Sequence, residues 1–105
     1  MSIVYDRRCP VARTLEIIGE RWTILILRDL VRHGPRKFHD LEISLAGISP
    51  NTLSARLKTL EDGGIIRRQF YNEHPPRAEY ALTDKGRELR PVLKTLKEWG
   101  EKHTG

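Results

Sequence analysis

The sequence predicts a mostly α-helical fold with a small β-hairpin. An amphipathic helix that starts with a proline is expected at residues 50–62, directly after a short turn that contains a glycine. Two β-rich runs with a Pro-containing loop between them follow this helix. Apolar residues also recur at helical spacing near both ends of the chain. Together these patterns are typical of a winged helix-turn-helix with extra N- and C-terminal dimerisation helices.

Composition limits the classes of protein that the chain can represent. Its 105 residues suit a single domain at residues 1–105. Lys and Arg exceed Asp and Glu by 19 to 14, so the net charge is +5, and this basic excess favours a polyanionic partner. No apolar run approaches the roughly 20 residues that cross a bilayer, and no secretory signal is visible, so we expect a cytoplasmic protein with no membrane association. A single cysteine excludes an intrachain disulfide framework.

The N-terminal part predicts two helices. Residues 1–8 are expected to form an irregular arm, and a first helix begins at Cys9-Pro10 and ends near Gly19. A second helix at residues 22–32 carries apolar side chains almost all round, which indicates central burial. The sequence His33-Gly34-Pro35 should end this helix.

The helix-turn-helix is expected at residues 39–62, after a brief strand at residues 36–38. Its first helix begins at His39 or Asp40, and the chain reverses at residues 46–49. In the second helix, Ser49 is the expected N-cap and Gly63 the expected left-handed end. The apolar stripe of the second helix consists of Leu53, Leu57 and Leu60.

The opposite side of the helix at residues 50–62 has the composition of a surface that reads DNA. Small and hydrogen-bonding side chains lie near its N-terminus and cationic ones further along, so bases and phosphates could both be reached. A solvated polar face is the alternative interpretation. The expected contacts are Ser49, Pro50, Asn51, Thr52, Ala55, Arg56 and Lys58.

The wing is expected at residues 65–82, with strands at residues 65–72 and 78–82. Arg68, His74 and Arg77 are its candidate DNA contacts, and Arg77 near the tip could enter a minor groove or lie on a phosphate. Alternatively, the hairpin only covers the core.

A last helix at residues 83–103 is expected to begin at Thr83 as N-cap and to bend at Pro91, which lacks a backbone N–H. Its apolar stripe suggests an interface with a twofold-related copy. Packing of this helix within one chain is the alternative. The candidate interface residues are Leu89, Val92, Leu93, Leu96 and Trp99.

Three runs of sequence resemble the HxlR-type winged-helix transcriptional regulators of bacteria and archaea. The resemblance extends from Cys9 to about Gly100, and its most specific parts include Cys9-Pro10, residues 48–64 and the phrase that begins at Tyr80. The three runs are CPVARTLEIIGERWTILILRDL, KFHDLEISLAGISPNTLSARLKTLEDGGIIRR and PPRAEYALTDKGRELRPVLKTLKEWG.

The resemblance implies a homodimer that binds double-stranded DNA at an inverted-repeat operator and represses or activates neighbouring genes. It places the recognition helix at residues 50–62 and the wing at residues 71–80. It also implies that Cys9 is a candidate redox sensor, since similar regulators sense electrophiles or oxidants through that position. Arg7, Arg8 and a helix N-terminus beside Cys9 favour the reactive thiolate. A buried, inert Cys9 is the alternative.

Other functions receive less support from the sequence. The four histidines lie on unrelated segments, so we expect no metal site, and no pattern of an enzyme or of a cofactor site is present. One alternative is a regulator that binds a small aromatic effector between the dimer helices, with Trp22 and Trp99 as walls. Another is a winged-helix module that binds a protein instead of DNA.

Overall fold

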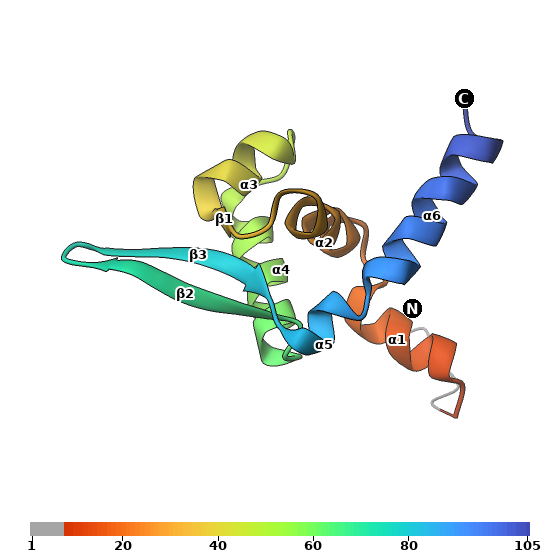
Figure 1. Ribbon diagram of the computed structural model, residues 1–105, viewed down its shortest axis with the longest axis horizontal. Helices are drawn as coiled ribbons and strands as arrows, with labels where there is room; N and C mark the ends of the chain where they lie inside the picture. The colour runs from red at the N-terminus through yellow and green to blue at the C-terminus, as the bar shows by residue number, and fades with distance from the viewer. Residues whose placement is uncertain (1–7) are drawn as a thin grey trace.

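The structure, a computed structural model, describes residues 8–105, so all of the expected N-terminal arm except Arg8 lies outside the described residues. The described chain is mostly helical, with one small antiparallel sheet (Figure 1). The predicted fold class is therefore confirmed. The elements are α1 (Pro10–Ile18), α2 (Arg21–His33), β1 (Arg36–Lys37), α3 (Phe38–Ser44), α4 (Pro50–Asp62), β2 (Ile66–Glu73), β3 (Pro76–Leu82), α5 (Asp84–Arg87) and α6 (Arg90–His103).

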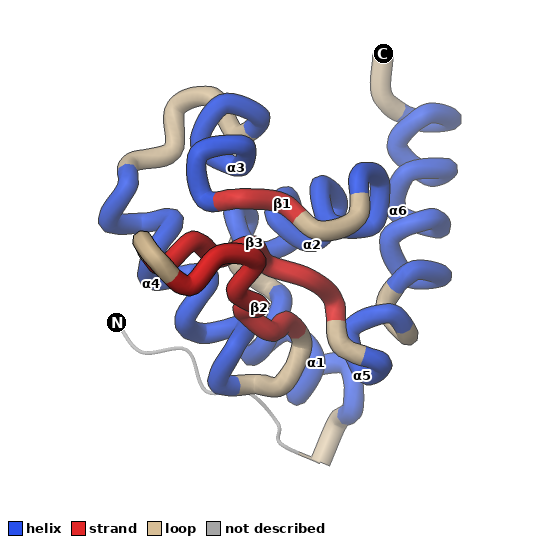
Figure 2. Tube along the Cα trace, turned by 60° about the vertical axis from the view of Figure 1, so that its left-hand side comes forward, coloured by secondary structure: helices blue, strands red, loops and turns tan. Residues whose placement is uncertain are grey.

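Helix α2 is the central element, as its apolar pattern predicted. It contacts α1, α3, α4 and the strands β1 and β3, and Figure 2 shows it passing between α3 and α6. Its inner side buries Ile26, Leu27 and Leu30 against α3, α4 and the base of the hairpin. Burial of each such side chain stabilises the fold by about 1.5–3 kcal/mol. The helix-turn-helix is thus built directly on α2.

The hairpin is longer and its turn tighter than expected. Strands β2 and β3 pair as far as Glu73 and Pro76, so His74 and Pro75 alone form the tip. The sequence predicted residues 73–77 as the loop between the two strands. Pro76 is tolerated at the first position of β3. The short strand β1 pairs with β3 at the base, which gives the sheet order β1-β3-β2.

Two helix ends differ from the prediction. The left-handed residue after α4 is Gly64, with φ of 72°, whereas Gly63 keeps a right-handed helical conformation. Helix α4 itself ends at Asp62 as expected, and Gly63 adds one right-handed residue before the left-handed Gly64 and the turn into β2. At the other boundary, Phe38 and not His39 or Asp40 begins α3, because the Asp40 carboxylate accepts a hydrogen bond from the backbone N–H of Lys37 at 3.1 Å.

The prediction of a single bent helix from Thr83 onwards is also wrong. The chain forms a short α5, capped as predicted by the Thr83 hydroxyl, and then a separate α6. Pro91 lies in the first turn of α6, where its missing N–H costs nothing, instead of bending a helix from inside. Gly86 of α5 lies so close to the carbonyl of Ile65 that a Cβ would be 2.1 Å from its oxygen. This close contact holds α5 on the base of the hairpin.

A buried carboxylate joins three elements beneath the helix-turn-helix. Asp29 of α2 is 1% exposed and accepts a hydrogen bond from the Ser44 hydroxyl of α3 at 2.6 Å. Its other oxygen forms an ion pair with Arg36 Nε of β1 at 3.6 Å, and Arg28 lies 3.4 Å from the first oxygen. A buried charge is tolerated only when it is paired in this way. Asp29 therefore ties α2 to both α3 and β1.

We predict that Asp29→Ala lowers the free energy of unfolding by about 2 kcal/mol, because Ser44 and Arg36 lose their common partner in a site largely closed to water. Urea denaturation measures this change. The control is Asp62→Ala, which removes an exposed carboxylate from α4 and should cost less than about 0.5 kcal/mol. Equal effects of the two substitutions would contradict the role given to Asp29.

Candidate nucleic-acid interface

Helix α4 is anchored by the apolar stripe that the sequence predicted. Leu53, Leu57 and Leu60 are all 2% exposed or less. At the start of the helix, the Ser49 side-chain oxygen accepts a hydrogen bond from the backbone N–H of Thr52 at 3.1 Å. This cap satisfies one of the free donors of the first turn. The helix is therefore held along one side, and its other side faces away from the core.

The outward side of α4 carries short polar and apolar side chains. Asn51, Ala55 and Lys58 are exposed, as expected for residues that reach DNA. Ser54 is exposed on the same side, three residues after Asn51 and four before Lys58. The prediction omitted Ser54, although helical spacing alone would have found it. Thr52 differs from this group, because it is half-buried and its hydroxyl accepts a hydrogen bond from Ser49 Oγ at 2.9 Å.

Lys58 lies in an exposed ion pair. Its Nζ is 3.3 Å from the Asp62 carboxylate, one turn later on α4, and both side chains are more than half exposed. Exposed pairs at this spacing contribute only about 0.3–0.5 kcal/mol. The ammonium group can therefore exchange this partner for a phosphate at little cost.

Arg56 lies apart from the outward side of α4. Its Nε is 3.2 Å from Glu20, the N-cap residue of α2, which also accepts a hydrogen bond from the backbone N–H of Thr23 at 3.0 Å. Partial burial raises the pKa of Glu20, but the backbone hydrogen bonds from Trp22 and Thr23 and the charge of Arg56 outweigh it, so its pKa is lower than usual. Arg56 thus links α4 to the start of α2, a contact that helix position alone did not reveal.

The hairpin projects from the body beside α4 (Figure 1). His74 and Arg77 are exposed at or next to its tip, where Asn72 is the strand partner of Arg77. Arg68 lies near the base, opposite Tyr80, with its guanidinium carbon 5.6 Å from the centre of the Phe70 ring. The structure therefore groups His74 with Arg77 and separates Arg68 from them.

The base of the hairpin has an electrostatic character of its own. Burial raises the pKa of Tyr80, and the nearby Arg68 charge offsets part of that rise. Lys37 of β1 places its ammonium group 4.9 Å from the centre of the exposed Tyr71 ring. Lys37 was not among the predicted contacts. In the sequence it is only one charged residue in the segment between two helices, and nothing there indicates a contact with the hairpin. Cations are thus present at both ends of the hairpin.

Helices α1 and α6 expose apolar side chains at the end of the molecule opposite the hairpin tip (Figure 1). None of the 14 residues of α6 is buried. Of the five predicted interface residues, Leu89 and Leu93 pack partly on the core of their own chain. The exposed apolar residues of these two helices are Val11, Leu15, Ile17, Val92, Leu96 and Trp99.

The two tryptophans have different surroundings within one chain. Trp22 is half-buried against the core, whereas Trp99 is 61% exposed and its ring centre lies 4.8 Å from that of His103. The placement of an aromatic effector between the helices of a dimer, with these tryptophans as walls, stays a prediction.

Cys9 is the N-cap residue of α1 and is half-buried. Its backbone carbonyl accepts a hydrogen bond from the N–H of Arg13 at 3.1 Å. Within residues 8–105, no group of three or more His, Cys, Asp or Glu side chains is arranged to hold a metal ion. Nor does any helix in this range have the length and apolar character needed to cross a membrane.

Comparison with known proteins agrees with this architecture. Residues 17–105 match the family described as HxlR-like helix-turn-helix. The uncharacterized HTH-type transcriptional regulator sll1512 of Synechocystis is 44% identical over 92 residues, which cover 88% of this chain and 67% of the relative.

Solved structures give the same result. The redox regulator HypR in its oxidized form superposes with a TM-score of 0.85 at 35% identity, covering 92% of this chain and 99% of HypR. The reduced form of the transcriptional regulator YodB from Bacillus subtilis superposes with a TM-score of 0.76 at 33% identity, covering 91% and 94% of the two chains. These relatives are transcriptional regulators and not enzymes. The chain therefore belongs to the HxlR-like helix-turn-helix family of transcriptional regulators.

Proposed function

We propose that this regulator binds double-stranded DNA sequence-specifically, as a homodimer on an inverted-repeat operator. The observation that carries the proposal is the outward side of α4, where Asn51, Ser54, Ala55 and Lys58 are exposed while three leucines hold the helix from behind. A module that docks on a protein has no need for a row of short polar side chains that ends in a cation.

The exposed residues of α4 suit the two kinds of contact that DNA offers. The Asn51 amide can donate to and accept from the edge of an adenine, and the methyl group of Ala55 can pack on a thymine methyl. Lys58, a turn and more along the helix, suits a phosphate. Ser49 and Thr52 are already hydrogen-bonded to each other and to the first turn, so we assign them to holding the helix start near the backbone.

The hairpin supplies the second contact. His74 and Arg77 at the exposed tip are suited to a neighbouring minor groove or its phosphates. Arg68 and Lys37, near the base of the hairpin, are suited to contact the DNA backbone between the two grooves. We take Arg56 out of the DNA-contacting set, because its partner is Glu20.

The apolar sides of α1 and α6 support the homodimer. Exposed Val92 and Trp99 on α6 and Val11 on α1 have no cover in the chain's described residues. In a twofold dimer that forms through α1 and α6, the two hairpins point away from the interface, on opposite sides of it. The recognition helices of such dimers lie about 34 Å apart, one turn of DNA, which matches an inverted repeat.

A response to oxidants or electrophiles through Cys9 is a second part of the proposal. Two of the similar structures are of regulators named for redox or solved in defined redox forms. Cys9 begins α1, one of the two helices with an exposed apolar side. Modification of its sulfur would therefore alter the start of a helix that we assign to the dimer contact.

Two substitutions on α4 test DNA reading. We expect Asn51→Ala to cost about 1–3 kcal/mol of operator binding while leaving binding to random DNA nearly unchanged, because the amide contacts a base edge. We expect Lys58→Ala to weaken both and to lower the slope of log affinity against log salt by about 1. Fluorescence anisotropy over a range of salt concentrations measures both quantities.

The control for these substitutions is Lys102→Ala, an exposed lysine near the end of α6, which should leave the affinity and its salt dependence in place. If Asn51→Ala weakened operator and random DNA equally, the assignment of base reading to this side of α4 would be wrong.

The homodimer is tested at α6. We predict that Trp99→Ala raises the dimer dissociation constant at least about tenfold, since a large aromatic side chain at the centre of an interface contributes 2 kcal/mol or more. Sedimentation velocity over a dilution series gives this constant. Glu98→Ala, which removes an exposed side chain one residue away, is the control. A wild-type protein that stays monomeric at micromolar concentrations would contradict the proposal.

The redox response is tested with benzoquinone. The Cys9 sulfur should form a thioether bond to a ring carbon of the quinone. The thiol proton ends on one carbonyl oxygen and the hydrogen of the attacked carbon moves to the other, so that the quinone becomes a thioether-substituted hydroquinone. We expect one adduct per chain by intact-mass measurement and a loss of operator affinity of about tenfold. Cys9→Ser should show neither change. Unaltered DNA binding by a fully modified protein would exclude Cys9 as a sensor.

A further inference from the structure

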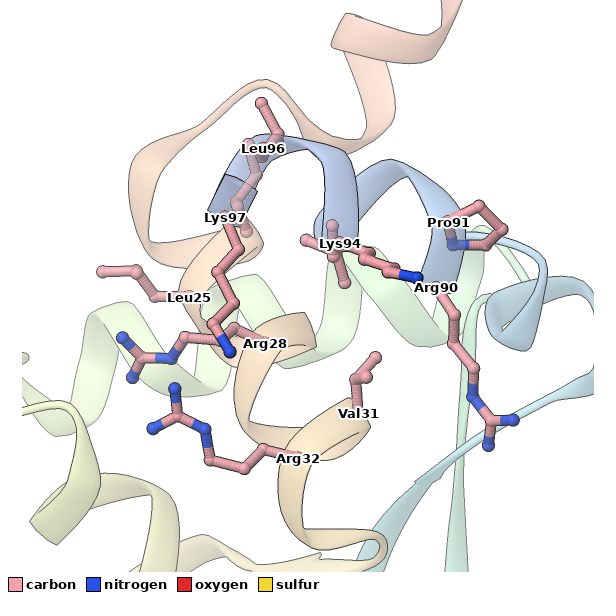
Figure 3. A pocket seen from close by; sticks show the side chains of 11 residues that line it. Leu25, Arg28, Val31, Arg32, Arg90, Pro91, Lys94, Leu96 and Lys97 are labelled. Atoms are coloured by element: carbon pink, nitrogen blue, oxygen red, sulfur yellow. The ribbon is translucent and has the colours of Figure 1, made fainter. Parts of the chain in front are cut away.

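A groove of about 830 Å³ separates α2 from α6 (Figure 3). Its volume lies within the range of sites that bind small organic molecules. It lies on the side of α2 away from the helix-turn-helix, and neither Trp22 nor Trp99 contributes to its lining. The groove is therefore distinct from the DNA-contacting surface, whereas Leu93 and Leu96 on its α6 side are also candidate interface residues.

The floor of the groove is apolar. Two helices contribute to it with side chains that are only partly covered, so a ligand there would remove further apolar surface from water. These floor residues are Ile24, Leu25 and Val31 of α2 and Leu93 and Leu96 of α6.

The rim of the groove is entirely cationic. Arg28 and Arg32 follow each other by one turn on α2, and Arg90, Lys94 and Lys97 do so on α6. No acidic side chain lines the groove. Figure 3 shows the side chains of Arg28, Arg32 and Lys97 on the same side of it, with Arg90 at the other end.

Most of these charges lack a counter-ion within the described chain. Arg28 lies near Asp29, and Lys94 is 4.0 Å from the exposed Glu98. Arg32, Arg90 and Lys97 make no ion pair with any residue in the range 8–105. Like charges placed around an apolar surface repel one another, and a bound anion relieves that repulsion.

We propose that this groove binds an amphipathic organic acid, with a hydrocarbon or aromatic body on the apolar floor and a carboxylate between Arg32 and Lys97. The charge of the rim selects for an acid over a neutral apolar molecule. The floor selects against free phosphate and against the outer backbone of duplex DNA, which offer the groove no comparable apolar part to bury. The proposal does not depend on DNA binding by α4 and can be tested in its absence.

Decanoate and 1-decanol are suitable probes, because they share a carbon chain and differ in charge. Isothermal titration calorimetry with the full chain should show decanoate, below its micelle concentration, binding at least about fivefold more tightly than 1-decanol. The substitutions Arg32→Gln and Lys97→Gln should each weaken decanoate binding by about three- to fivefold, the size expected for a partly exposed charge contact. Neither should change 1-decanol binding.

Lys102→Gln is the matched control, since it removes the same kind of charge from α6 outside the groove. Equal affinity for decanoate and 1-decanol, or the same loss from Lys102→Gln as from Lys97→Gln, would overturn the proposal, because binding would then reflect the exposed apolar side of α6 alone. Absence of decanoate binding would overturn it as well. In that case, protection of the groove methyl groups in the dimer would assign the groove to a second copy of the chain.

Discussion

The ion pairs and hydrogen bond of Asp29 are the interaction on which the rest of the arrangement depends. A carboxylate that is 1% exposed needs partners, and those partners come from three places along the chain: Arg28 beside it, Arg36 in β1 and Ser44 in α3. Because β1 pairs with β3, the same carboxylate contacts both the end of the first helix of the helix-turn-helix and one edge of the hairpin sheet. Apolar packing against α2 gives these elements their stability, but it does not by itself choose their relative positions. The hydrogen bond from Ser44 and the ion pair with Arg36 add directional contacts that favour one arrangement.

Local signals in the sequence predicted much of the fold. The leucine stripe of α4, the caps at Ser49 and Thr83 and the order of helix, turn, helix and hairpin are all as expected, because each follows from neighbouring residues. The break between α5 and α6 was missed, since a proline can bend a helix or begin one, and spacing alone does not distinguish the two. The break follows a short helix whose Gly86 lies against the carbonyl of Ile65, a residue distant in the sequence.

In the candidate site, too, some features could be predicted from the sequence and others could not. Which side of α4 faces outward could be predicted from its periodicity, as the exposure of Asn51 and Lys58 confirms. The pairing of Arg56 with Glu20 could not, because an arginine on the flank of a helix looks the same whether it meets solvent, DNA or a distant carboxylate. Asp29 was overlooked for a related reason, since one acid in an apolar helix gives no indication of its partners. The groove beside α6 likewise exists only once two separate helices have been placed together.

The distribution of buried residues has a consequence for how such a chain can change over time. Every buried apolar side chain of the described residues lies between Ile18 and Leu82, and all of α6 lies beyond that range. Apart from Leu93, which packs partly on the core, residues of the final helix can therefore change with little effect on the folded centre. Related proteins that descend from one ancestral gene could therefore acquire new dimer partners or new small-molecule ligands through substitutions in this terminal helix. The helix-turn-helix and the hairpin would stay unchanged.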